Sequence, residues 1–498
     1  MIKLIPDKTK NSSHLVQSFL IVCFMAAAVF ILLMDSPLHI WRYGEASTDS
    51  SVFKTVALMM RRGYMPYRDS FDHKGPLLYL INFAGDCISA YRGVWLIEYL
   101  FMLITFVAMY RIARIKCGKV LSCVAVLTAS SLLCDFLREG NLAEEYALPF
   151  ITIALFIFLD YFINGQINTA RLIVCGFCFG SVCMLKFNMI SVWIVFCIAV
   201  LTDCIREKQY QRLIKFVVPF LLGVCVIVLP MILWLAIGHS LKDFWECYIL
   251  FNFKYISADA GISQKLGQLF FYAGNTVIFS ALLISVYFAV VSKKFSDVAY
   301  VCYLVLTVCF TALSGLPYRH YGMMLVPATV FPIAYLFAEC RKHDVITGVS
   351  VIALLAALYF GGNIVLPAWV PSVEKAVERY EVRGDKDYSP VTQYVCALIE
   401  ENTAYDDKIS VYGQWNMIYV MSGRMHASRY SYQFPIGRVN RSIMDEYFKE
   451  LEEELPRIIV VQKGHYDDKI STFLKDHHYV SLWVENTENP VRVYQYVN

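Results

Sequence analysis

The chain has 498 residues, of which 58% are hydrophobic and only 17% are charged, and its mean hydropathy is +0.51. Soluble globular proteins are about half apolar and about a quarter charged, so these values argue against a soluble protein and for one with many membrane spans. The formal net charge of +3, without a Lys/Arg-rich run, argues against a nucleic-acid partner.

Apolar segments of about 17 to 25 residues, the length that crosses a bilayer, recur along residues 1–367. The first follows a weakly basic start and lacks a convincing signal-peptide cleavage site, so we expect an uncleaved span. A further apolar segment, 76–90, fits a re-entrant segment, an interfacial helix or a short span. We predict about eleven spans, at 17–35, 92–113, 119–136, 145–163, 170–186, 189–204, 214–237, 267–291, 296–314, 321–339 and 344–366.

The connecting loops fall into two alternating sets. One set is basic, with "RIARIKCGK", "REKQYQRLIK", "SKKFS" and "ECRKHD", and the positive-inside rule places it in the cytoplasm. The other set is aromatic and acidic, with "DFLREGNLAEEY", "KFN" and "SGLPYRHY". An odd number of spans then leaves the N-terminus inside and the C-terminal region outside.

The chain changes character near residue 371. Residues 371–390 are charged and resemble a linker, and residues 391–498 alternate helical and strand-like patterns. We predict a helix in "VTQYVCALIEENT", strands in "KISVYG" and "PRIIVVQ", a helix in "SIMDEYFKELEEEL", and a closing strand pair in "YVSLWVE" and "VRVYQYV". The pattern predicts a small extracytoplasmic α/β domain.

The cysteines carry little functional information. Most of the 16 lie in apolar segments, where a thiol behaves as a small buried hydrophobic group. Cys175 and Cys178 form a CxxC, but they lie inside a predicted span with no second CxxC or partner histidine, which argues against a zinc or redox site.

Asp49 stands near the start of an apolar-periodic stretch in the first external loop, 36–91. The pattern predicts an amphipathic helix lying flat on the membrane, with Lys54, Arg61 and Arg62 towards the headgroups. Residues 47–49 are all good capping types, so Asp49 fits a helix cap. The alternative is a general base at the lipid–water border.

The same loop contains a dense group of charges, "RDSFDHKGP". Lys74 precedes a Gly-Pro pair that fixes the backbone where the chain turns apolar again. Lys74 could bind a phosphate or extend to lipid headgroups. Asp72 and His73 are supporting candidates.

Further charged residues stand at the external ends of predicted spans. Glu144 and Glu145 begin one span, where the helix dipole favours carboxylates, so a structural role competes with a chemical one. Arg319, His320 and Lys186 could bind a phosphate or neutralise those carboxylates. Carboxylates and cations in one interfacial cluster suit a reaction on a lipid-linked phosphate.

Several stretches together resemble the GT-C glycosyltransferase superfamily: "TDSSVFKTVALMMRRGYMPYRDSFDHKGPLLYLIN", "GNLAEEYALPF", "LKFN", "YRHY" and "VYGQWNMIYVMSGRMHASRYSYQFP". The branch is the bacterial one similar to protein O-mannosyltransferases and the lipid A aminoarabinose transferase (glycosyltransferase family 39). The resemblance is densest in the first external loop and covers most of the chain. It implies an all-α polytopic domain with interfacial helices in that loop, at 1–370, followed by the α/β domain.

The resemblance implies transfer of one sugar, with inversion, from a polyprenyl-phosphate donor outside the bacterial cytoplasmic membrane. By position, Asp49 is the base and Lys74 the phosphate ligand; Arg319, His320 and Lys186 are further phosphate or acceptor contacts. The family's loop acid is often followed by Glu, here Ser50, and Gly75 interrupts its Lys-Pro motif. Whether Glu144 or Glu145 shares the role of base or helps to hold a divalent cation stays open, as do the sugar and the acceptor, which can be a glycan, a lipid or a protein.

Two other functions fit a membrane protein of this composition. A transporter or flippase of lipid-linked saccharides buries ionisable groups within its spans and shows internal repeats. Only Glu98 is an acid well inside a predicted span, and no repeat is visible. A polysaccharide polymerase or ligase would depend on a large external loop late in the chain, whereas here the charged loop comes first.

Overall fold

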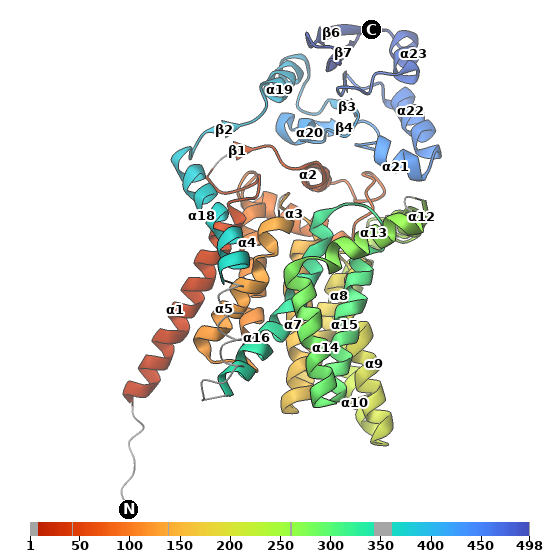
Figure 1. The fold of residues 1–498 in the computed structure, drawn as a ribbon. Helices are drawn as coiled ribbons and strands as arrows, with labels where there is room; N and C mark the ends of the chain where they lie inside the picture. Colours follow the sequence, from red (N-terminus) through yellow and green to blue (C-terminus); the bar gives the residue numbers. More distant parts are fainter. Residues whose placement is uncertain (1–7, 42, 138, 259–260, 343–360, 498) are drawn as a thin grey trace, which may run out of the picture.

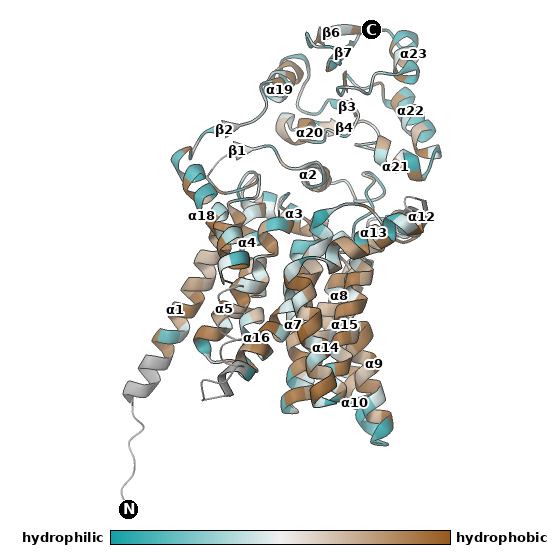
Figure 2. Ribbon diagram, viewed as in Figure 1, coloured by the Kyte–Doolittle hydropathy of each residue, from teal (hydrophilic) through white to brown (hydrophobic). Residues whose placement is uncertain are grey.

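The computed structural model describes residues 8–41, 43–137, 139–258, 261–342 and 361–497. A bundle of helices carries a small α/β domain at one end (Figure 1). We call that end of the bundle the domain side. The bundle helices are mostly hydrophobic along their length, and hydrophilic residues gather at their ends and on the α/β domain (Figure 2). This distribution is the one expected for a protein that spans a bilayer.

Seven helices among the described residues are long and apolar enough to cross a membrane. The chain is therefore a mostly helical, multi-pass membrane protein, which confirms the predicted fold class. The spanning elements are α1 (Lys8–Leu33), α4 (Gly93–Arg114), α5 (Lys119–Ser130) with α6 (Leu133–Phe136), α7 (Ala143–Asn164), α10 (Tyr210–Ile237), α15 (Phe295–Ala312), and η3 (Arg319–Leu325) with α16 (Val326–Lys342).

Three shorter helices lie alongside the long ones: α8 (Thr169–Cys183), α9 (Ser191–Arg206) and α14 (Thr276–Ser292) (Figure 1). The expected span 267–291 is wrong in its first part, because α13 (Ile262–Ala273) is bent by 80° from α14. The break is stabilised by Asn275, whose side chain caps α14 by accepting from the backbone N–H of Val277. The expected span 344–366 falls mostly on residues 343–360, outside the described residues.

The first loop, residues 36–91, carries α2 (Thr48–Arg61) and α3 (Pro76–Ile88) on the domain side (Figure 1). At 13 residues, α3 is shorter than a membrane span. Pro76 occupies the first turn of α3, where its missing N–H costs nothing. Helix α3 packs against both α2 and α4, so it connects the loop helix α2 to the bundle.

The expectation that basic residues of α2 face the headgroups is wrong for Lys54 and Arg62, whereas Arg61 is exposed. Lys54 is only 4% exposed and forms an ion pair with Asp86 of α3 at 3.4 Å. Arg62 forms an ion pair with Asp406 of the α/β domain at 3.0 Å. The reason is that α3 covers one face of α2 and the α/β domain covers another, so both cations find protein partners.

The α/β domain contains a five-stranded sheet in the order β4-β3-β5-β7-β6. Strand β3 pairs in parallel with β4 and β5, and β7 pairs antiparallel with β5 and β6. The predicted helices and strands are present, whereas β4 and three short helices were not predicted. The elements are α19 (Pro390–Asn402), β3 (Lys408–Tyr412), α20 (Met417–Ser422), β4 (Met425–His426), α21 (Phe434–Val439), α22 (Ser442–Glu454), β5 (Ile458–Val461), α23 (Asp468–Asp476), β6 (Tyr479–Val484) and β7 (Arg492–Tyr496).

A helix and a small sheet connect the bundle to the α/β domain. Helix α18 (Leu366–Glu381) occupies the first part of the segment expected to be a linker. Two short strands, β1 (Tyr43–Gly44) and β2 (Lys386–Asp387), then pair in parallel. This pairing joins the start of the first loop to the start of the α/β domain. The loop is therefore in contact with the α/β domain as well as with the bundle.

Candidate active site

Asp49 lies in the first turn of α2, but it does not cap the helix. The cap is Ser47, whose hydroxyl accepts from the backbone N–H of Ser50 at 3.3 Å. Among the described residues, the Asp49 carboxylate has neither a hydrogen-bond nor an ion-pair partner. The interpretation of Asp49 as the helix cap is therefore wrong, because Ser47 has that role.

The surroundings of Asp49 are strongly charged. Burial raises the pKa of the Asp49 carboxyl above its ordinary value, the nearby Lys74 and His320 oppose this, and Glu139 and Asp72 add to it. The Asp49 carboxylate thus feels the charges of two other loop residues, of Glu139 in the segment before α7, and of His320 in η3. A carboxylate with a raised pKa is a better proton acceptor near neutral pH.

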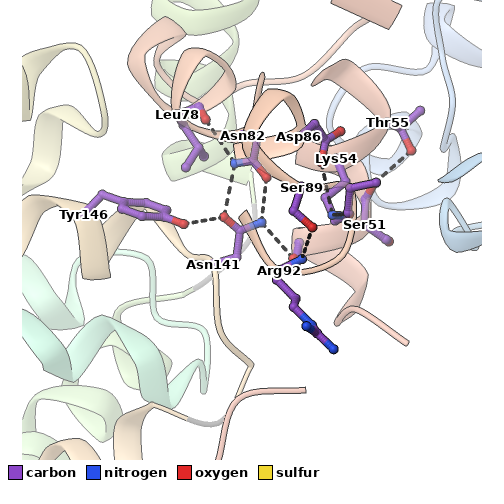
Figure 3. Close-up of polar contacts among 12 residues, drawn as sticks. Ser51, Lys54, Thr55, Leu78, Asn82, Asp86, Ser89, Arg92, Asn141 and Tyr146 are labelled. Atoms are coloured by element: carbon purple, nitrogen blue, oxygen red, sulfur yellow. Dashed lines mark hydrogen bonds and ion pairs between the residues drawn. The ribbon is translucent and has the colours of Figure 1, made fainter. Parts of the chain in front are cut away.

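A buried amide network fixes the start of α2 (Figure 3). The side chains of Asn82 and Asn141 donate to each other, at 3.1 and 2.8 Å, and Asn141 also donates to the Ser50 hydroxyl at 2.8 Å. Tyr146 of α7 donates to Asn141 at 2.8 Å. Asn141 has a φ of 59°, a left-handed conformation that asparagine tolerates well. The network therefore joins α2, α3 and α7 directly beside Asp49, and nothing in the sequence beyond a Gly-Asn pair predicted it.

Lys74 lies where the loop returns to the bundle. The backbone N–H of Gly75 donates to the Leu185 carbonyl at 2.9 Å, and that of Leu77 donates to the Met184 carbonyl at 3.0 Å. A Cβ at position 75 would lie 2.0 Å from the Met184 oxygen. Only glycine fits this close approach, which explains the residue that separates Lys74 from Pro76.

Within the described part of the chain, neither the Lys74 ammonium nor the Asp49 carboxylate is paired with an opposite charge. Its Nζ lies 2.9 Å from Nε2 of His73, and no carboxylate among the described residues forms an ion pair with it. Its backbone carbonyl accepts from the Tyr67 hydroxyl at 2.8 Å, and its backbone N–H donates to the Tyr79 hydroxyl at 3.2 Å. The backbone is thus fixed while the ammonium retains capacity to bind an anion.

Asp72 is buried and fully hydrogen-bonded. Its two oxygens accept from the hydroxyls of Tyr79 and Tyr432, each at 2.8 Å, and Oδ1 lies 3.4 Å from Nδ1 of His73. Tyr432 comes from the α/β domain, and sequence reasoning identified neither tyrosine. A tyrosine 360 residues away along the chain gives no local pattern that could predict this contact.

The cations predicted at the helix ends lie on the domain side, but each has a carboxylate beside it. Lys186 forms an ion pair with Glu144 at 2.5 Å, and Arg319 forms one with Asp135 at 2.5 Å. His320 lies 3.6 Å from Glu139. Their charges are therefore compensated within the protein, in contrast to that of Lys74.

Glu144 and Glu145 differ in what they contact. Glu144 is paired with Lys186, as above, whereas one oxygen of Glu145 accepts from the backbone N–H of Leu142 at 3.2 Å, at the start of α7. The alternative of a structural role at a helix N-terminus thus describes Glu145 well. Within the described part of the chain, no group of three or more His, Cys, Asp or Glu residues is arranged to hold a metal ion.

Comparison with solved structures places the whole chain in one fold. ArnT from Cupriavidus metallidurans, solved with undecaprenyl phosphate, aligns with a TM-score of 0.63 and 11% identity over 96% of this chain and 98% of that chain. The oligosaccharyltransferase AglB from Archaeoglobus fulgidus, solved with an inhibitory peptide and a dolichol-phosphate, aligns with a TM-score of 0.51 and 12% identity over 97% and 74%. The chain shares the GT-C fold of these proteins, which agrees with the fold expected from the sequence.

Sequence comparison gives the family. Among curated proteins, none matches this sequence. The family model of the competence-induced Ccs4 N-terminal domain matches residues 6–348, which include the bundle and the first loop with Asp49 and Lys74. That match spans well over half of the chain. The protein therefore belongs to the competence-induced Ccs4 N-terminal domain family and has the GT-C fold.

Proposed function

We propose that the protein is an inverting membrane glycosyltransferase that moves a single sugar from a polyprenyl-phosphate donor to an acceptor on the domain side. One observation carries the proposal: Asp49 and Lys74 act on each other across the site and neither has an ion-pair partner among the described residues. The cations at the helix ends lie beside carboxylates. The fold shared with ArnT, which was solved with undecaprenyl phosphate, supports a lipid-phosphate donor.

The two unpaired groups match the needs of a single displacement. The acceptor oxygen bonds to the anomeric carbon while the bond from that carbon to the phosphate oxygen breaks. Asp49 takes the proton of the acceptor, and polyprenyl phosphate leaves with the electron pair of the broken bond. The leaving phosphate gains a negative charge, which the Lys74 ammonium stabilises. Attack from the face opposite the phosphate inverts the anomeric carbon.

The orientation of the protein follows from its basic loops. The α4–α5, α9–α10 and α14–α15 connections lie at the end of the bundle opposite the domain side (Figure 1), and they carry the Lys/Arg-rich stretches. The positive-inside rule then places that end in the cytoplasm. We infer that the site faces the outer side of a bacterial cytoplasmic membrane. The N-terminus then lies on the opposite, cytoplasmic side.

A transfer assay tests the proposal. Membranes containing the wild type or Asp49→Asn receive a panel of radiolabelled polyprenyl-phosphate sugars, and transfer of label out of the lipid fraction is measured. The matched control is Asp406→Asn, which changes a carboxylate that is 85% exposed and lies in the α/β domain. We expect Asp49→Asn to lose about 10²- to 10⁴-fold of the rate, as for removal of a general base, and Asp406→Asn to retain it.

The pH dependence gives a second readout. Because the Asp49 carboxyl must be deprotonated to act and its pKa is raised by burial, the rate should fall as the pH drops through that raised pKa. The fall should occur at a higher pH than for an exposed aspartate. Full transfer by Asp49→Asn would disprove the assignment of the base, and no transfer by the wild type from any donor would disprove the function.

A further inference from the structure

Asp72, His73 and Lys74 are consecutive in sequence and are also connected through their side chains. Oδ1 of Asp72 lies 3.4 Å from Nδ1 of His73, and Nε2 of the same ring lies 2.9 Å from Nζ of Lys74. The imidazole therefore stands between a carboxylate and an ammonium, with one ring nitrogen facing each of them.

The direction of these contacts fixes the protonation of His73. An ammonium group can only donate hydrogen bonds, so Nε2 of His73 must accept from Lys74. The ring proton then resides on Nδ1, where it faces the Asp72 carboxylate. Burial, with the charge of Lys74 nearby, also lowers the pKa of His73 to about 3, so the ring is neutral at physiological pH.

The far end of this chain of contacts is held by the α/β domain. Asp72 is 2% exposed, and Tyr79 and Tyr432 donate to its two oxygens. Tyr432 is 4% exposed, and its hydroxyl also lies 3.5 Å from Nδ1 of His73. The adjoining segment is fixed as well, because the backbone N–H of Phe71 donates to the carbonyl of Arg429 at 2.7 Å.

We propose that the α/β domain completes the donor site through Tyr432, which holds Asp72 and so fixes the tautomer of His73. His73 then accepts one N–H of Lys74 and directs the ammonium, leaving its two other N–H groups for the oxygens of the donor phosphate. Tyr432 and His73 are thus positioning residues that act through Lys74. This inference rests on the proposed lipid-phosphate donor. It predicts that a protein without the contact from Tyr432 of the α/β domain binds that donor poorly.

Direct binding of undecaprenyl phosphate, the lipid without a sugar, tests the inference. The full-length protein in nanodiscs is titrated with this lipid, and binding is measured for the wild type and for Tyr432→Phe. The matched control is Tyr430→Phe, because Tyr430 is in the same segment, is equally buried at 4% exposure, and donates to Glu446 of α22 instead. Loss of a hydrogen bond to a charged group predicts about tenfold weaker binding for Tyr432→Phe, and the control should bind as the wild type does.

A double-variant comparison separates positioning from general stability. If Tyr432 acts through Lys74, Tyr432→Phe should have no further effect on binding in the Lys74→Ala protein. His73→Leu, at a side chain that is 15% exposed, should behave in the same way. Equal effects of Tyr432→Phe with and without Lys74 would overturn the inference.

The outcomes distinguish this inference from the proposed function. If wild-type protein binds the lipid but Tyr432→Phe binds it as tightly as Tyr430→Phe does, the inference fails while the proposed donor stands. If wild-type protein does not bind undecaprenyl phosphate at all, the proposed donor itself fails.

Discussion

The domain side carries charge in two regions that differ in how the charges are compensated. In the first loop, Asp49 and Lys74 have no ion-pair partner among the described residues. At the ends of the spanning helices, Lys186 and Arg319 each form an ion pair. Unpaired charge at a membrane boundary is costly. Under the proposed function, the charges without an ion-pair partner are the reactive groups, and the paired charges at the helix ends are structural.

The difference also shows in what supports each region. The charges at the helix ends are held by ion pairs with each other, Lys186 with Glu144 and Arg319 with Asp135. The loop is held by tertiary contacts: the amide network of Asn82 and Asn141 beside Asp49, and the tyrosines on Asp72 beside Lys74. The comparison predicts that substitutions in the loop reduce activity and leave stability intact, whereas those at the helix ends reduce stability first.

The largest effect is expected at Lys74. In the proposed function Lys74 stabilises the leaving phosphate, so Lys74→Ala should lower the transfer rate about 10²- to 10³-fold while the thermal unfolding midpoint stays close to that of wild type. Lys74→Arg keeps the charge and should recover part of the rate. Measurement of transfer and of unfolding in the same preparations checks both statements. A loss of folding in Lys74→Ala would contradict the expectation that first-loop substitutions affect activity and not stability.

The next effect is expected at the buried pair of Glu144 and Lys186. Removal of one partner leaves the other charge buried, so Glu144→Gln should lower the free energy of unfolding by about 3 kcal/mol. The double variant Glu144→Gln/Lys186→Met should recover most of that loss, because no uncompensated charge is left. Denaturant or thermal unfolding of the three variants measures this, and a double variant no more stable than Glu144→Gln would contradict it.

Acid should loosen the contact between the loop and the α/β domain. Burial lowers the pKa of His426, whose Nε2 lies 3.1 Å from the Ser70 hydroxyl, from 6.5 to about 4. The unfolded chain therefore binds a proton before the folded chain does, and stability is lost as the pH falls from about 6.5 to about 4. His73, with its pKa lowered to about 3, shifts in the same direction.

Thermal unfolding followed over that pH range tests the effect of acid. His426→Asn should reduce the loss of stability between these pH values, because it removes one of the two titrating groups. An identical pH dependence in His426→Asn would show that this histidine does not contribute.

The smallest effect is expected at Arg319. The Arg319 and Asp135 side chains are 49% and 39% exposed, and exposed ion pairs contribute about 0 to 1 kcal/mol. Arg319→Ala should therefore change stability by less than about 1 kcal/mol, and its transfer rate should stay far above that of Lys74→Ala. A loss of rate as large as that of Lys74→Ala would show that Arg319 acts with the charges of the first loop. The proposed difference between the two regions would then be wrong.

Several features could be predicted because they depend on local sequence. Long apolar segments gave the multi-pass character, and alternating patterns gave most of the α/β domain. The dense charges of the first loop, together with its resemblance to a superfamily, identified Asp49 and Lys74 as candidates. The basic side chains of α2 were misplaced, because the partners of Lys54 and Arg62 are Asp86 and Asp406, which are distant along the chain.

The sequence by itself determined where the chain is apolar enough for the membrane and which residue types stand at its boundary, because both depend on composition over short windows. Only the tertiary structure decided which of those charges are paired. It assigned the helix cap to Ser47 rather than Asp49, placed Glu144 on Lys186, and brought Tyr432 of the α/β domain to Asp72. Pairing depends on distance in space between remote segments, and a single sequence does not contain that distance.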